Sequence, residues 1–378
     1  MKDLIIPLIV AAITYGTPLL FGTLGEILTE KSGNLNLGVE GIMFMGGAVG
    51  IGSIYYYEKL FSSANGFVAV LIALVFAFLA GAFAALIFSF ITITLRANQN
   101  VTGLALSIFG TGVGQFIGEI LRIREGGFIT VSNGLKAFFI SSPFPKFLRD
   151  IPVAGKLLFS HSFFFYLGIL LAIAMHLFLT KSRTGLHLRA VGESPATADA
   201  AGINVMRFKY LATVIGGGIS AIGGMVYITT IASCVWNHEG LSGEGWLAVA
   251  LVIFCMWRPC SAIWGSVLFG ALTILRNYLI IQAIPTELYK TLPYLVTLSC
   301  LLHAAAQRRA PPQSAKMPRS PACLLRAARR VGGRRILSEG RHASGTSPVP
   351  RRRRVLYAGG QRDGTRRAAR CAAGGAGA

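Results

Sequence analysis

Residues 181–207 read KSRTGLHLRAVGESPATADAAGINVMR and lie between two apolar runs, 163–179 and 210–231. Each run approaches the ~20 residues that a membrane span needs. Short loops rich in Lys and Arg stay in the cytoplasm, and residues 180–209 hold five basic residues against two acidic ones. The alanine-rich end of this loop predicts a short helix, which would be marginal alone in water. The stretch therefore predicts a multi-span membrane protein on which a soluble partner pushes from the cytosol.

The rest of the chain supports a membrane protein. The 378 residues are 53% hydrophobic and 13% charged, whereas a soluble domain carries about a quarter charged residues. Run 66–95 is long enough for a tilted helix or a helix plus a re-entrant piece, and runs 245–257 and 292–303 are short enough to be broken segments. We predict an all-α membrane bundle of about 8–10 spans, with interrupted helices and a short cytosolic helix. The apolar runs are 4–24, 37–57, 66–95, 101–121, 163–179, 210–231, 245–257, 262–284 and 292–303.

The composition changes after His303. Residues 304–378 carry 18 basic and 2 acidic residues and are rich in Arg, Ala and Gly, so they hold +16 of the net charge of +21. Such a segment buries too little apolar surface to fold alone and is predicted to be disordered. A solvated tail and a polybasic arm on anionic lipid are two readings, but GC-rich codons read out of frame also give this composition. We hypothesise a frameshift near residues 299–305 and assign the membrane domain to residues 1–303, with no nucleic-acid partner.

Charge and glycine patterns predict the orientation and the packing. The positive-inside rule places the turns at Arg96 and Arg258 on the cytoplasmic side with residues 180–209, and the 122–160 connection outside. It leaves the side of Met1 open. Glycines at four-residue spacing let helix backbones approach closely. These stripes predict a compact bundle. The first consists of Gly110, Gly114 and Gly118, the second of Gly216, Ser220 and Gly224, and the third of Gly46 and Gly50.

The stretch GNLNLGVEG, residues 33–41, brings Asn34, Asn36 and Glu40 into an apolar run. A carboxylate inside a span is costly and marks a functional-site candidate. Interrupted helices also expose free backbone groups to a polar substrate. We therefore place these three residues near a substrate pathway. The structural alternative is that Glu40 caps a helix end or pairs with Lys31.

The stretch GLSGEGWLAVA, residues 240–250, resembles the first one. Glu244 is flanked by glycines at the start of an apolar run, as Glu40 is, and Trp246 stands beside it. The similarity suggests a weak internal duplication of the kind found in transporters. We add Glu244 and Trp246 to the expected substrate pathway. Trp246 as a plain interfacial anchor is an equally good reading.

Residues 184–202 form an ordered pattern. Thr184 to Arg189 alternate apolar and polar residues, residues 192–195 (GESP) predict a turn and a helix start, and Ala196 to Ala201 predict a helix that Gly202 ends. A simple connector between spans seldom contains such an ordered series of turn and helix-end signals. The segment is therefore expected to contact a partner.

Several functional classes lack their motifs. The sequence has no Gly-x-x-x-x-Gly-Lys-Ser/Thr loop for ATP, and it has no row of arginines or carboxylate–histidine relay in an apolar run. Its six cysteines show no metal-binding spacing. Neither a metal site nor a bound cofactor is expected. Energy for transport must come from a partner protein or from a gradient.

The two motifs, residues 34–41 (NLNLGVEG) and residues 185–203 (GLHLRAVGESPATADAAGI), resemble those of permease subunits of bacterial ABC importers for nucleosides and simple sugars. The resemblance covers roughly residues 1–300. Ser194 departs from the asparagine usual there, and residues 255–260 (CMWRPC) are bulkier than the usual glycine-containing turn.

The resemblance implies a permease rather than an enzyme, multi-pass in the plasma (inner) membrane, that moves a nucleoside or a simple sugar inward. It further implies two cytosolic ATP-binding cassette subunits that bind the ATP, a second similar permease (as a heterodimer or a homodimer), an external substrate-binding lipoprotein and surrounding membrane lipid. Residues 192–203 would form the coupling helix that sits on the ATPase. The residues expected to carry coupling are Arg189, Gly192, Glu193, Pro195, Ala201 and Gly202.

A gradient-driven secondary transporter or channel without an ATPase is the alternative. It would explain interrupted helices equally well. It gives no reason for the ordered cytosolic loop at residues 181–207.

Overall fold

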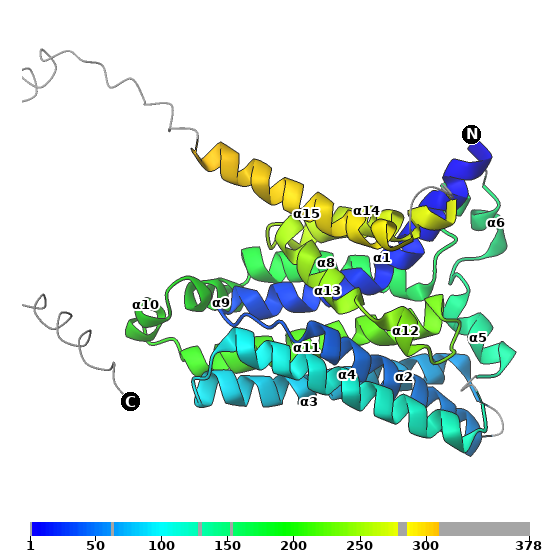
Figure 1. Ribbon diagram of the computed structural model, residues 1–378, viewed down its shortest axis with the longest axis horizontal. Coiled ribbons are helices and arrows are strands. Elements are labelled where there is room, and N and C mark those ends of the chain that lie inside the picture. The colour runs from blue at the N-terminus through cyan, green and yellow to red at the C-terminus, as the bar shows by residue number, and fades with distance from the viewer. Residues whose placement is uncertain (1, 62–63, 128–130, 152–153, 279–285, 310–378) are drawn as a thin grey trace, which may run out of the picture. The chain divides into compact units, whose positions relative to one another are not determined.

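The computed structural model describes residues 2–61, 64–127, 131–151, 154–278 and 286–309 (Figure 1). These residues form helices and connecting turns, with no strand in the described ranges. The helices are α1 (Lys2–Lys31), α2 (Val39–Leu60), α3 (Gly66–Ser89), α4 (Gln99–Arg124), α5 (Asn133–Ile140), α6 (Lys146–Arg149), α7 (Ala154–Leu158), α8 (Phe163–Lys181), α9 (Arg183–Glu193), α10 (Pro195–Ala200), α11 (Val205–Val226), α12 (His238–Leu241), α13 (Glu244–Phe254), α14 (Pro259–Tyr278) and α15 (Thr286–Arg309). Two π-helical turns, η1 (Phe90–Thr94) and η2 (Tyr227–Ile231), extend α3 and α11.

Within the described residues, each predicted apolar run lies mostly on one of these helices, so the all-α prediction is confirmed. In the described ranges five helical segments are long and apolar enough to cross a membrane, fewer than the 8–10 spans expected. Three further predicted runs, which start at residues 37, 262 and 292, fall on α2, α14 and α15. These helices have 22, 20 and 24 residues. Helix α13 has 11 residues, about 16 Å of rise, and cannot cross a hydrocarbon core of about 30 Å. The five segments are Ile5–Lys31, Gly66–Thr94, Gln99–Arg124, Phe163–Lys181 and Val205–Ile231.

Helix α11 lies at the centre of the bundle. It packs on α1, α2 and α3, while α1 also contacts α13 and α14, and α4 lies on the outer side of α2. The glycine stripes stand at these crossings, as predicted. A Cβ atom added to Gly110 of α4 would lie 2.7 Å from the Cα atom of Gly41 in α2, and one added to Gly224 of α11 would collide with the Met43 carbonyl oxygen of α2. The absence of side chains at these crossings therefore sets the distance between the helices.

Helices α3 and α11 end in the same way. The last turn of α3 is η1, with the sequence FITIT, and the last turn of α11 is η2, with the sequence YITTI. In each turn a buried threonine hydroxyl donates to the carbonyl four residues earlier, Thr92 to Phe88 at 2.8 Å and Thr229 to Met225 at 2.9 Å. Run 66–95 is thus one helix with a π-helical last turn, and no re-entrant piece follows it.

The basic turns predicted to share a side lie at one end of the bundle. Helices α9 and α10 project there, opposite α5 and α6 and the start of α1 (Figure 1). The Thr94 and Tyr210 hydroxyls, 2.5 Å apart, join the Arg96 turn to the start of α11. The Trp257 indole N–H donates to Glu30 near the end of α1, which brings the Arg258 turn to the same end. Residues 304–309, which were predicted to be disordered, continue α15 as helix because this helix runs to Arg309. The rest of the predicted disordered tail, from residue 310 onward, lies outside the described residues, as do residues 279–284 of the run 262–284.

Candidate functional site

The carboxylate of Glu40 binds the start of α13. Its Oε1 atom accepts a hydrogen bond from the Gly243 N–H at 2.6 Å, and its Oε2 atom accepts from the N–H groups of Gly245 at 2.7 Å and Trp246 at 3.3 Å. The first N–H groups of a helix have no partner inside the helix, and a negative charge is favoured there. Glu40 therefore caps α13 from a different helix, 203 residues away in sequence, and does not pair with Lys31.

Close backbone packing places Glu40 at this position. Gly245 lies against the first turn of α2, where an added Cβ atom would lie 2.8 Å from Glu40 Oε2 and would overlap the Glu40 Cα atom. Gly243 has φ +94°, in the left-handed region that glycine adopts without strain. The glycines that flank Glu244 in the sequence thus let the Glu40 carboxylate reach the backbone N–H groups of α13.

Glu244 is the second carboxylate at this junction. It is 7% exposed, against 6% for Glu40. Trp246 is half-buried beside it. The structure therefore brings Glu40, Glu244 and Trp246 together at the start of α13.

Asn34 and Asn36 lie in a different place, in the loop between α1 and α2. The Asn34 amide donates to the hydroxyls of Thr213 at 3.1 Å and Thr92 at 3.4 Å, and its oxygen has no partner within the described residues. The Asn36 oxygen accepts from the Gly38 N–H at 2.9 Å. Both asparagines are fully buried. Asn34 holds the loop to η1 and α11, whereas the Asn36 side chain bonds within the loop.

Two carboxylates that the sequence analysis missed stand beside this loop. Glu26, 1% exposed, accepts from the Asn36 N–H at 3.1 Å. One helical turn later, Glu30 accepts from the indole of Trp257 in the turn between α13 and α14. The signal was present in the sequence, since Glu26 and Glu30 are one turn apart at the end of the first apolar run. The end of α1 thus touches both the Asn34 loop and the far end of α13.

The 181–207 stretch forms two helices. Residues 184–189, which alternate in polarity, lie in α9 with Gly192 and Glu193 in its last turn, so the expected turn at residues 192–195 is limited to Ser194. Helix α10 then covers Pro195 to Ala200 and ends at Ala201 and Gly202, as expected, with Gly202 at φ +80°. Arg189 and Glu193 form an ion pair one turn apart, at 3.8 Å.

Helix α10 is exposed on nearly all sides. Of its residues only Ala198 is buried, and Ala201 and Gly202 after it are exposed as well. Helix α9 buries one face, through Gly185, Leu188 and Val191. The segment is therefore fixed to the bundle along α9, while the surface of α10 stays exposed.

Gly192 joins this segment to the buried loop. A Cβ atom added to Gly192 would collide with the Lys31 carbonyl oxygen and would lie 3.1 Å from the Gly33 nitrogen. A cavity of about 220 Å³ beside this contact is lined by Glu30, Lys31, Arg189, Gly192, Glu193 and Trp257. Because Gly33 directly precedes Asn34, a movement of α9 would act on the loop that leads to Glu40.

The model of the family described as "Branched-chain amino acid transport system / permease component" matches residues 8–301. The chain belongs to this permease family. It is therefore a transport component in the plasma (inner) membrane and not an enzyme. The helical bundle and its apolar helices agree with this membership.

Relatives of this permease carry more specific names. It is 32% identical to the "Guanosine ABC transporter permease protein NupQ" of Bacillus subtilis (strain 168), over 80% of this chain and 92% of the relative. It is 31% identical to the "Putative glucose ABC transporter permease protein TsgC13" of Haloferax volcanii, over 78% and 90%. It is 30% identical to the "Nucleoside ABC transporter permease protein NupC" of Lactococcus lactis subsp. cremoris, over 76% and 88%. These names favour an ABC permease over the gradient-driven alternative.

Proposed function

We propose that this permease moves nucleosides inward as a membrane subunit of an ABC importer. Relatives named for guanosine and for nucleosides support that substrate class, and simple sugars are the second candidate because a relative named for glucose also matches. A nucleoside contains a sugar, whose hydroxyls can bond to carboxylates and phenols. Glu244, which is buried at the start of α13, can supply such a partner.

The contact of Gly192 with the α1–α2 loop carries the proposal. It connects an exposed helix pair, which needs a partner surface, to a buried loop that leads to Glu40 and so to α13. Two ATP-binding cassette subunits would hold α10 and bind the ATP, and a second permease and an external lipoprotein would complete the importer. ATP hydrolysis would then shift the permease between two states by moving α9 against Lys31 and Gly33.

The expected pathway residues take separate roles in this proposal. Glu244 and Trp246 face the substrate, while Glu40 holds the start of α13 in place. Asn34 and Asn36 fix the loop that transmits the movement. The substrate undergoes no chemical change.

Charge reversal at Glu193 tests the coupling role. Glu193 is exposed, with 76% of its side chain accessible, so Glu193→Lys should leave the protein folded in the membrane. In membrane vesicles containing the whole importer, we expect substrate-loaded binding protein to stimulate ATP hydrolysis at least several-fold less than with the original chain. Glu239→Lys, an exposed reversal on α12 at the opposite end, is the matched control and should have no effect. Wild-type stimulation with Glu193→Lys would contradict the proposal.

A further inference from the structure

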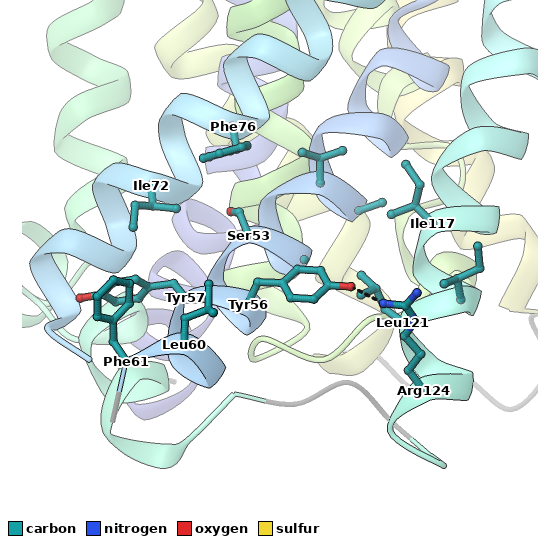
Figure 2. A pocket seen from close by; sticks show the side chains of 14 residues that line it. Ser53, Tyr56, Tyr57, Leu60, Phe61, Ile72, Phe76, Ile117, Leu121 and Arg124 are labelled. Carbon is teal, nitrogen blue, oxygen red and sulfur yellow. Dashed lines mark hydrogen bonds between the residues drawn. The ribbon is translucent and has the colours of Figure 1, made fainter. Parts of the chain in front are cut away.

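An apolar groove lies between α2, α3 and α4, away from the residues discussed above (Figure 2). Its volume is about 490 Å³, which lies within the ~300–1,000 Å³ typical of ligand pockets. Its walls include Gly52, Ser53, Ile72, Phe76, Ile117 and Leu121. Among these the serine hydroxyl is the one polar side-chain group, and it donates to the Gly50 carbonyl at 2.7 Å. The groove therefore suits an apolar occupant.

The groove runs along the second half of α2. It extends from Ala48, near the middle of α2, to Leu60 at the end of that helix, about 18 Å of helical rise. Half of a bilayer's hydrocarbon core is about 15 Å thick. The groove is thus about as long as one leaflet is deep, and it ends at the side of the bundle opposite α9 and α10. Phe76 on its rim is 50% exposed, so the groove opens toward lipid.

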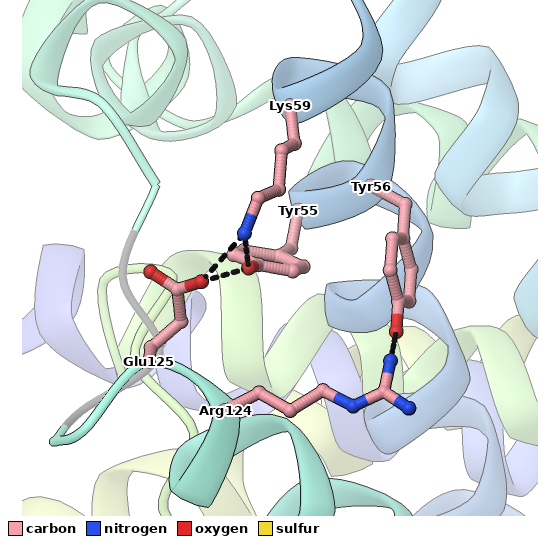
Figure 3. Close-up of polar contacts among 5 residues, drawn as sticks. All are labelled: Tyr55, Tyr56, Lys59, Arg124 and Glu125. Carbon is pink, nitrogen blue, oxygen red and sulfur yellow. Dashed lines mark hydrogen bonds and ion pairs between the residues drawn. The ribbon is translucent and has the colours of Figure 1, made fainter.

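Among the described residues at the Leu60 end of the groove, one cation has no acidic partner. Lys59 pairs with Glu125 at 3.0 Å, and Arg122 pairs with Glu119 at 2.5 Å. The Arg124 guanidinium donates to the Tyr56 hydroxyl at 3.0 Å, and no carboxylate pairs with it in the described part of the chain (Figure 3).

The Tyr56 contact orients the guanidinium over the groove. Tyr56 and Arg124 both line it and point toward each other across its Leu60 end (Figure 2). An arginine held in this way favours a phosphate, because its planar N–H groups match phosphate oxygens.

We propose that this groove binds a glycerophospholipid, with one acyl chain between α2, α3 and α4 and the phosphate on Arg124. The length of the groove matches an acyl chain in one leaflet, its walls match hydrocarbon, and the Arg124 guanidinium lies at the end where the headgroup of that lipid would sit. The lipid belongs to the leaflet on the side away from α9 and α10. By filling the gap between α3 and α4, it stabilises the outer half of α2.

Native mass spectrometry of the purified full-length chain, with dioleoyl phosphatidylglycerol added, tests the proposal. Arg124→Gln should lower the affinity for the first lipid about tenfold, which corresponds to ~1.4 kcal/mol. Arg122→Gln, on the same helix and also exposed, removes a charge already paired with Glu119 and should change it little. Equal losses in both variants would overturn the proposal, because they would indicate a general effect of net charge.

Two further measurements separate the acyl chain from the headgroup. Ser53→Phe fills the groove and leaves Arg124 in place, so it should also lower lipid binding several-fold. Glycerol 3-phosphate, which has no acyl chain, should not compete with the lipid at equal concentration. Competition by glycerol 3-phosphate, unchanged binding with Ser53→Phe, or a groove covered by a second permease subunit in the assembled importer would each overturn the proposal.

Discussion

Glu40 connects two helices that are far apart in sequence. Its carboxylate accepts three backbone N–H groups from residues 243–246. A hydrogen bond to a charged group contributes about 1.5–3 kcal/mol, and a buried donor that loses its partner costs about 1–3 kcal/mol. The start of α13 should therefore depend on this one side chain.

Glu40→Gln should loosen α13 with little change in side-chain shape. An uncharged amide presents one acceptor oxygen where the carboxylate presents two, so at least one N–H group of α13 loses its partner. We expect a loss of roughly 2 kcal/mol in stability and a fall in substrate uptake of at least tenfold. Thermal unfolding of the purified protein and uptake in cells measure the two effects.

An exposed carboxylate provides the control for Glu40. Asp199→Asn on α10 removes the same charge from an exposed position and should leave the unfolding temperature unchanged. If Glu40→Gln lowered the unfolding temperature no more than Asp199→Asn, the cap would have no part in holding α13.

The sequence identified Glu40 by the cost of a carboxylate in an apolar run, but its partners could not be predicted. Gly243, Gly245 and Trp246 reach it through tertiary packing, which no local pattern encodes. The signal for Glu26 and Glu30 was weaker, since both stand near the end of a run beside Lys31, where charges are ordinary. Burial of Glu26 depends on the loop that folds over it.

At the scale of helices, α9 and α10 form one segment that is fixed to the bundle along the buried face of α9. Serine and asparagine caps fix the limits of the segment: the Ser182 hydroxyl accepts from the Gly185 N–H at 2.9 Å, and the Asn204 amide oxygen accepts from the Arg207 N–H at 3.0 Å. Between these caps Gly192 touches the backbone of Lys31 and Gly33. This contact can exist because residue 192 has no side chain.

Gly192→Val should separate α9 from the α1–α2 loop. The added side chain would meet the Lys31 carbonyl oxygen, which is backbone and cannot turn away. We expect the variant to reach the membrane but to lose most of the substrate-stimulated ATP hydrolysis. Ala190→Val adds two methyl groups at an exposed position of the same helix, so it should keep the stimulation, and equal activity of both variants would contradict the coupling route.

Helix positions could be predicted from the sequence because apolar runs in lipid form helices, and the end of α10 could be predicted from Gly202. Helix α9 was harder. Residues 184–189 alternate in polarity, but α9 buries Gly185, Leu188 and Val191 at helical spacing of three, so the helical period extends beyond the alternating stretch. The π-helical turns η1 and η2 have no sequence signal that we could have used.

At the scale of the whole molecule, residues 1–303 should carry the transport activity. The family model matches residues 8–301, and the composition changes after His303. We predict that a chain stopped after residue 303 supports the same uptake as the full chain. A chain stopped after residue 285 lacks α15, which packs on α13 and α14, and should not.

The outcome also bears on the hypothesis of a frameshift near residues 299–305. Lower uptake by the chain stopped after residue 303 would show that residues 304–378 take part in transport. Resequencing the gene through codon 310 tests the reading frame itself. An intact frame would rule the frameshift out.

Uptake of radiolabelled guanosine tests the central claim most directly. It is measured in cells that express the whole importer, with and without this gene, and with excess unlabelled adenosine, ribose, glucose or leucine as competitors. The account predicts gene-dependent uptake that requires ATP and that adenosine alone suppresses. Gene-dependent uptake that ribose or glucose suppresses instead, or the absence of uptake with the protein present in the membrane, would contradict it.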